Sequence, residues 1–116
     1  MMVPVESVSI YCCPKPVDFR KGIYALATFV EGELGEALFS QTLFLFTNRQ
    51  YNRVRILYWD QTGFCLWTKV LEQSRFHWPH RESLRYLTTE QLRWLLSGVD
   101  IEQINPHPAL SYQSVL

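Results

Sequence analysis

The sequence predicts an α+β fold in which a small, mainly antiparallel β-sheet packs against two amphipathic helices. Three observations support this prediction. Short apolar or alternating segments are typical of strands, two stretches carry apolar residues at helical spacing, and a tight polar turn joins two aromatic-rich segments. The 116 residues suit a single domain. We expect its ordered core to cover about residues 8–100, with an irregular tail over residues 101–116.

The first half of the chain predicts a strand, a helix and a second strand. Residues 8–13 are rich in residues that favour strands, and Pro14 and Pro16 follow them. Asp18 is the predicted N-cap of the helix, because its carboxylate can accept from the unpaired N–H groups of the first turn. The apolar face of this helix consists of Phe19, Ile23, Leu26 and Val30. Residues 41–47 form a continuous apolar strand, which we expect to be buried on both faces.

The middle of the chain predicts a hairpin. A polar turn over residues 48–52 leads into a strand over residues 53–59, whose side chains alternate between two faces. The DQTG turn at residues 60–63 joins it to a strand over residues 64–71, and we expect Gly63 to adopt a positive φ. Four aromatic rings surround this turn, and we expect them to be mostly core with at most one exposed: Tyr58, Trp59, Phe64 and Trp67.

A second helix is predicted near the C-terminus. Thr88 and Gln91 have the spacing of a capping box. The apolar face that follows consists of Leu92, Leu95, Leu96 and Val99, and Gly98 is expected to end the helix. We expect one shared core, formed by Phe19, Ile23, Leu26, Phe44, Phe46, Ile56, Leu66, Leu92 and Leu95.

Composition and charge narrow the functional classes. The chain has only three cysteines, and no basic-then-apolar leader precedes the fold, so we expect a cytoplasmic protein. The longest apolar run without charge, residues 43–46, is too short to span a membrane. The net charge is zero, but residues 49–85 carry seven basic against three acidic side chains, a net charge of +4. This asymmetry favours an anionic partner for the middle of the chain.

The sequence offers little for catalysis. His77 and His80 flank a Trp-Pro pair, but three scattered cysteines do not supply the paired ligand spacing of a zinc site. Asp18, Asp60 and Asp100 are the carboxylates available for a magnesium-dependent nuclease, yet each has a predicted role at a cap, a turn or a helix end. There is no glycine-rich phosphate loop and no nucleophile motif. We therefore predict no catalytic residue, no metal and no cofactor, and hence no enzymatic activity.

Binding to an anionic macromolecule is better supported. Basic side chains interleaved with aromatic rings on an exposed sheet face are typical of proteins that hold single-stranded nucleic acid, with cations on phosphates and rings against bases. The candidate contact residues for nucleic acid or a protein partner are Arg20, Lys21, Arg49, Arg53, Arg55, Lys69 and Arg75. The spacing does not distinguish DNA from RNA, or either from an acidic protein.

Several short motifs, taken in their order along the chain, resemble those of one family of mobile-element proteins. They are DFRKG at residues 18–22, LFLF at 43–46, LYWDQTGFCLWTK at 57–69, RFHWP at 75–79, LT at 87–88, QL at 91–92 and LLSG at 95–98. This set resembles the small accessory protein, called TnpB, that is encoded by bacterial insertion sequences of the IS-sixty-six type. Val70 and Ser74 depart from the family pattern, which usually has a basic residue and a glycine there.

The resemblance implies a non-enzymatic accessory factor for transposition, acting with the DDE transposase of the same element. Under this hypothesis the partners are that transposase and the element DNA, without a membrane. Two alternatives remain open. One is a protein adaptor that binds the transposase without contacting DNA, and the other is a metal-dependent nuclease.

Overall fold

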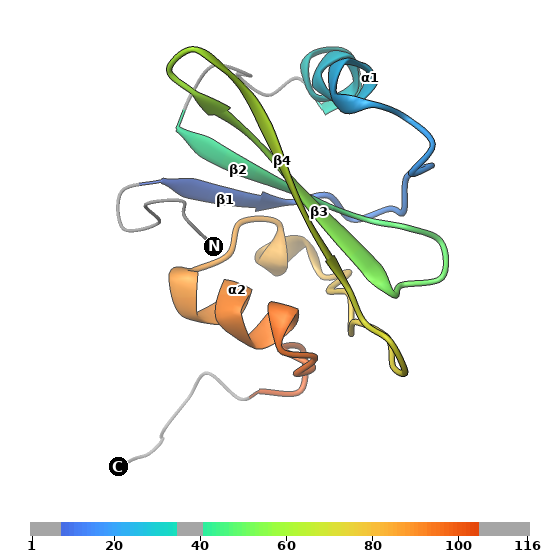
Figure 1. Ribbon diagram of the computed structural model, residues 1–116. Helices are drawn as coiled ribbons and strands as arrows, with labels where there is room; N and C mark the ends of the chain where they lie inside the picture. The colour runs from blue at the N-terminus through green and yellow to red at the C-terminus, as the bar shows by residue number, and fades with distance from the viewer. Residues whose placement is uncertain (1–7, 35–40, 105–116) are drawn as a thin grey trace.

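A four-stranded sheet forms the centre of the protein (Figure 1). The computed structural model describes residues 8–34 and 41–104. The strands lie in sequence order in the sheet and are β1 (Ser9–Cys12), β2 (Thr42–Thr47), β3 (Arg53–Asp60) and β4 (Gly63–Val70). Strands β1 and β2 are parallel, whereas β2–β3 and β3–β4 are antiparallel. The sheet is therefore mixed, within the predicted α+β class.

The helices are short and lie on opposite faces of the sheet (Figure 1). Helix α1 (Ile23–Phe29) is followed directly by a π-helical turn, η1 (Val30–Leu34), on the crossover from β1 to β2. A 3-10 turn, η2 (Glu82–Leu84), and helix α2 (Thr89–Leu96) follow β4. None of the helices within the described residues is long and apolar enough to cross a membrane.

The core is divided by the sheet, so the prediction of one shared core is wrong. On one face, Leu26 of α1 packs with Phe44 and Phe46 of β2. On the other, Leu92 and Leu95 of α2 pack with residues that include Ile56. Phe19, Ile23 and Leu66 contribute to the α1 side only as partly buried side chains. The division arises because every side chain of β2 is buried, so both faces of the sheet must be covered.

The predicted hairpin is present, but its strained residue is not the glycine. Strands β3 and β4 pair from Arg53 with Val70 to Asp60 with Gly63. Gln61 adopts the positive φ, 53°, and the Thr62 N–H donates to the Asp60 carbonyl. Gly63 has no positive φ, which contradicts the prediction. A turn of only two residues places its left-handed position at Gln61 and leaves Gly63 as the first paired residue of β4.

None of the four aromatic rings at the hairpin is exposed, which agrees with the prediction, but none is fully buried. Tyr58, Trp59, Phe64 and Trp67 are all half-buried. Tyr58 and Trp67 pack on the α2 side of the sheet, whereas Phe64 packs on the α1 side and meets Trp59 edge-on, with 4.9 Å between ring centroids. The rings form the margins of the two cores because β4 is an edge strand.

The two helix starts differ in how they are capped. Helix α2 begins with the predicted capping box between Thr88 and Gln91, and Gly98, with a φ of 89°, follows its last turn. Helix α1 begins four residues later than predicted from Asp18, with Gly22 as N-cap and no side-chain cap. The Asp18 carboxylate instead accepts from the N–H of Arg20, which makes it part of a turn before the helix.

Residues 85–87 cover the outer edge of β1. The N–H of Cys12 donates to the Arg85 carbonyl (2.7 Å), and the N–H of Leu87 donates to the Ile10 carbonyl (2.9 Å). Tyr11 and Tyr86 form the bridge between these two bonds. Strand β1 is thus paired on both sides.

The predicted tail begins with a buried contact. Ile101 is part of the α2-side core, and the Glu102 carboxylate accepts from the N–H groups of His80 and Arg81. The rest of the predicted tail, residues 105–116, lies outside the described residues.

Candidate nucleic-acid interface

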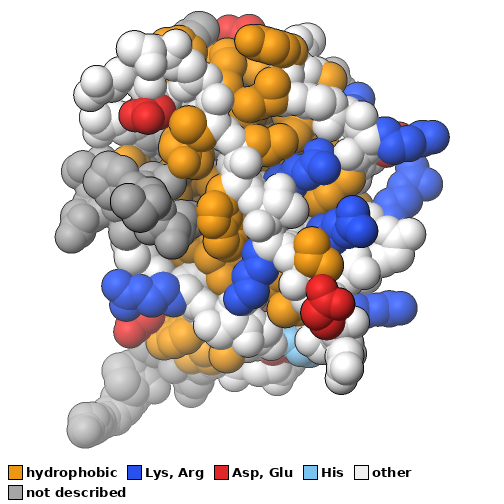
Figure 2. Space-filling model, viewed as in Figure 1, with side chains coloured by type: hydrophobic (Ala, Val, Ile, Leu, Met, Phe, Trp, Pro, Cys, Tyr) orange, Lys and Arg blue, Asp and Glu red, His pale blue; other side chains and the backbone are white. Residues whose placement is uncertain are grey.

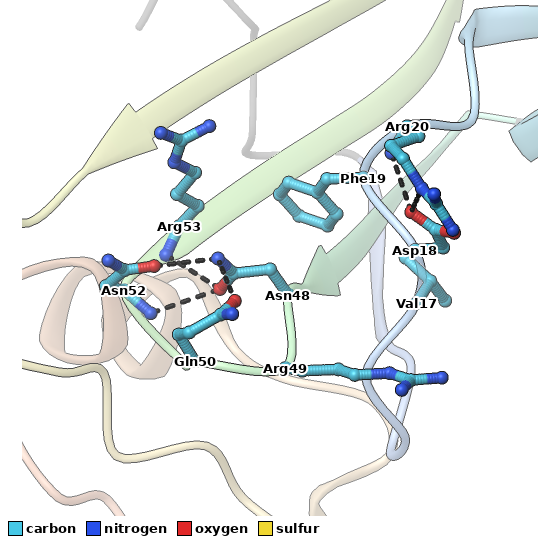
Figure 3. A pocket seen from close by; sticks show the side chains of 9 residues that line it. All are labelled: Val17, Asp18, Phe19, Arg20, Asn48, Arg49, Gln50, Asn52 and Arg53. Atoms are coloured by element: carbon cyan, nitrogen blue, oxygen red, sulfur yellow. Dashed lines mark hydrogen bonds and ion pairs between the residues drawn. The ribbon is translucent and has the colours of Figure 1, made fainter.

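A pocket of about 510 Å³ opens between the segment before α1 and the turn that joins β2 to β3 (Figure 3). The N–H of Val17 donates to the carbonyl of Thr47 (2.9 Å), which holds these two segments side by side. The pocket is lined by Val17, Asp18, Phe19, Arg20, Asn48, Arg49, Gln50, Asn52 and Arg53. Two motifs that are distant in the sequence, DFR and the polar turn, therefore form one site.

The turn is organised by the side chain of Asn48, which is 8% exposed. Its Oδ1 accepts from the N–H groups of Asn52 (3.1 Å) and Arg53 (3.0 Å). Its Nδ2 donates to the side-chain oxygens of Asn52 (2.7 Å) and Gln50 (3.2 Å). A buried amide with four hydrogen bonds fixes the backbone around it. Arg49 and Arg53 are thus presented from a rigid turn.

Arg49 and Arg53 have no direct ion-pair partner in the described part of the chain, although the charge of Arg49 also helps to lower the pKa of Asp18. Both are exposed, and their side chains leave the turn in different directions (Figure 3). Within residues 8–34 and 41–104, neither guanidinium forms an ion pair or donates a hydrogen bond. Lys and Arg side chains gather at this end of the molecule, on the right of Figure 2. The arrangement can hold anionic groups such as phosphates.

Arg20 is already paired. Its Nη2 lies 2.6 Å from Asp18 Oδ2, and its Nε lies 3.0 Å from each carboxylate oxygen. These hydrogen bonds hold the pKa of the Asp18 carboxyl well below its usual range, so the pair stays ionised at neutral pH. Because the Arg20 side chain is 91% exposed, solvent screens this pair strongly. Arg20 therefore contributes to the wall of the pocket and supplies N–H groups, but it adds little net charge.

Arg55 supports the site from within the fold. Its Nη1 donates to the carbonyls of Phe19 (3.0 Å) and Lys21 (3.2 Å), and its Cζ lies 4.5 Å from the centroid of the Phe19 ring. Its Nε is buried without a hydrogen-bond partner in the described part of the chain. These contacts pin the loop before α1 onto β3. Arg55 therefore positions Phe19 more than it offers a free charge.

The remaining predicted basic residues are dispersed. Lys21 is exposed in the loop before α1. Arg75 is exposed. It lies beside the β2–β3 turn, because the N–H of the next residue, Phe76, donates to the Tyr51 carbonyl. Lys69 pairs across the hairpin with Val54 on the α2 side, and its Nζ donates to the Leu96 carbonyl (2.8 Å). Lys69 thus binds the end of α2 on the opposite face from Arg53 and Arg55.

Sequence reasoning missed the polar half of the pocket. Asn48, Gln50 and Asn52 were expected only to form a turn, and Phe19 only to form core. The available signal was the density of amides between two strong strands, in NRQYN at residues 48–52. Asn side chains favour such turns because they bond to nearby backbone groups.

The groups considered for metal binding do not assemble. No cluster of three His, Cys, Asp or Glu side chains among the described residues could hold a metal ion. Burial raises the pKa of the Cys12 and Cys13 thiols, so both are protonated at neutral pH. Asp100 lies 3.9 Å from His77 Nδ1, in an exposed contact.

Comparison with known proteins decides the family. The model of the family described as IS66 Orf2 like protein matches residues 8–106. The chain belongs to the IS66 Orf2-like family. All of the pocket's lining residues lie within the matched range.

Two relatives of this IS66 Orf2-like chain are proteins of Sinorhizobium fredii. The one named "Uncharacterized protein y4jC" is 29% identical over 109 residues, which cover 93% of each chain. The one named "Uncharacterized protein y4hO" is 32% identical over 101 residues, which cover 86% of this chain and 88% of the relative. No solved structure matches the chain.

Proposed function

We propose that this chain is a non-enzymatic accessory factor for transposition of its insertion sequence and binds element DNA beside the transposase of that element. Family membership supports the link with an insertion sequence. The observation that most supports DNA contact is the pair of exposed guanidinium groups of Arg49 and Arg53 on one rigid turn, neither of which has an ion-pair partner within the described residues. Arg75 and Lys21, both exposed, extend the same basic end.

Salt dependence of binding tests the DNA contact. The purified protein is titrated with terminal-repeat and unrelated duplex DNA across a salt series. Arg49→Ala and Arg53→Ala should each lower the slope of log K against log salt by about 0.9, because each removes one phosphate contact. Both variants should weaken binding to the two duplexes alike. Arg93→Ala is the matched control, because Arg93 is an exposed arginine on α2.

Two results would overturn this proposal. Failure to bind either duplex at low salt, together with tight and salt-insensitive binding to the transposase, would favour the adaptor. Multiple turnovers of DNA nicking in the presence of magnesium would show that the protein is an enzyme.

The adaptor has its own supporting observation, and we retain it as a second candidate. Tyr24 on α1 is 74% exposed and meets Phe64 edge-on, with 6.3 Å between ring centroids. Figure 2 shows hydrophobic side chains exposed on the viewed face. Aromatic side chains of this kind often anchor protein interfaces. If the adaptor function holds, Tyr24→Ser should weaken transposase binding at least tenfold and leave DNA binding unchanged, with the exposed Tyr86→Ser as control.

A further inference from the structure

We propose that the pocket between residues 17–20 and the β2–β3 turn binds one unpaired nucleotide of DNA, with the backbone phosphates on its two sides at Arg49 and Arg53 and its base against Phe19. This inference rests on the proposed function and specifies what part of the DNA this site takes. The pocket volume of about 510 Å³ lies within the range of small-ligand sites. A base inside a duplex is stacked and paired and must leave the stack to enter a pocket of this kind.

The charge of the pocket suits a phosphodiester. Asp18 is paired with Arg20 through a bidentate contact, and three lining arginines against this one carboxylate give the pocket a net charge of +2. Arginine binds phosphate oxygens through two parallel N–H groups, which fixes the orientation of the phosphate as well as its position. The two phosphates that flank the nucleotide are thus placed at the edge of the pocket, one at Arg49 and one at Arg53, where both side chains are exposed and point in different directions.

An aromatic surface lies beside this charge. The Phe19 ring lines the pocket, and Figure 3 shows it between Arg53 and Arg20. Arg55 holds the ring from the fold side, with its Cζ 4.5 Å from the centroid and a hydrogen bond to the Phe19 carbonyl. The ring is therefore in place before a ligand arrives. Stacking of an unpaired base on a protein aromatic ring is a general means of holding single-stranded DNA.

The floor of the pocket supplies hydrogen-bond donors. Asn48 uses both ends of its amide within the turn and has nothing left to offer a ligand. Gln50 and Asn52 use only their side-chain oxygens in these bonds, so each keeps its NH₂ group. In the described part of the chain neither NH₂ group donates a hydrogen bond. Amide donors of this kind reach the acceptor atoms on the edge of an exposed base.

The test compares blunt duplex DNA with the same duplex carrying a short single-stranded extension, by fluorescence anisotropy at one salt concentration. The native protein should bind the extended duplex about tenfold more tightly than the blunt one, the size expected for one stacked base. Phe19→Leu and Gln50→Ala should each reduce that preference at least threefold and leave blunt-duplex affinity unchanged. The matched controls are Phe29→Leu on α1 and Gln103→Ala, neither of which lines the pocket.

Gln50 keeps the test decisive if Phe19→Leu disturbs folding, because Gln50 is exposed and outside both cores. Equal affinity of the native protein for blunt and extended duplexes, with the Arg49 and Arg53 salt slopes intact, would overturn the pocket assignment and leave the proposed function standing. Failure to bind any DNA would overturn both. Loss of transposase binding in the Gln50 variant, with DNA binding unchanged, would assign the pocket to an acidic protein segment and overturn the inference.

Discussion

The indole nitrogen of Trp78 donates a hydrogen bond to the carbonyl oxygen of Cys13, 2.8 Å away and 65 residues earlier in the chain. Both residues are buried, at 4% and 2% exposure. The bond ties the segment after β4 to the end of β1. It gives the tryptophan of the RFHWP motif a structural role.

Trp78→Phe should therefore destabilise the protein by about 1–3 kcal/mol through the loss of this donor to a buried carbonyl. The free energy of unfolding is measured by urea denaturation. Trp94→Phe is the control, because Trp94 is only half-buried on α2 and donates no such bond among the described residues. Equal losses in the two variants would show that ring size, and not the bond, sets the effect.

Leu92→Ala tests the α2 side of the core. Leu92 is 2% exposed and packs in that cluster, so we expect a loss of about 2–5 kcal/mol in the free energy of unfolding. Arg93→Ala, on the exposed side of the same helix, should change it by less than about 0.5 kcal/mol. A loss below about 1 kcal/mol for Leu92→Ala would contradict the packing of α2 on the sheet.

Substitution by alanine should destabilise the protein at Gly98, after α2, but not at Gly63, in the hairpin. Gly63 lacks a positive φ, and a Cβ there would meet nothing within 4 Å, so Gly63→Ala should be neutral within about 0.5 kcal/mol. Gly98 has a φ of 89°, so Gly98→Ala should cost about 1 kcal/mol. Thermal unfolding of both variants measures the difference. The reverse order of stability would place the left-handed residue at Gly63 after all.

Replacing Arg55 by alanine should lower the stability of the protein, whereas replacing Arg53 should not. Arg55→Ala removes two hydrogen bonds to loop carbonyls and the contact with the Phe19 ring, so it should cost about 1–3 kcal/mol of stability. Arg55→Lys should recover only part of this, because an ammonium cannot reproduce the planar stacked group. Arg53→Ala should cost less than about 0.5 kcal/mol, since its side chain is exposed. Equal losses for Arg53→Ala and Arg55→Ala in urea denaturation would refute this division.

Local patterns predicted the elements well. The capping box of Thr88 and Gln91 and the fully buried strand β2 depend on residues close in sequence, and both are present. The position of the positive φ was missed because strand pairing begins at Gly63, so the register and not the glycine decides which turn residue is strained.

The site was harder to predict than the elements. Arg53 and Arg55 share one strand face, yet only Arg53 is free, because the loop of Phe19 and Lys21 folds over Arg55. The pocket likewise depends on the contact of Val17 with Thr47, which brings DFR beside the polar turn. Such long-range contacts leave no periodic signal in the sequence.

The double pairing of β1 has a consequence for synthesis of the protein. Its second partner, residues 85–87, leaves the ribosome only after all four strands have been made. Until residues 85–87 have been made, the outer edge of β1 exposes unpaired N–H and C=O groups. Three of the four side chains of β1 become buried in the fold, so this apolar edge is a template for pairing with another chain. A polypeptide released before residue 85 would contain the complete sheet and still be prone to aggregation. Protection of the nascent sheet against pairing with other chains therefore depends on residues 85–87, which are made late and form a single bridge with β1.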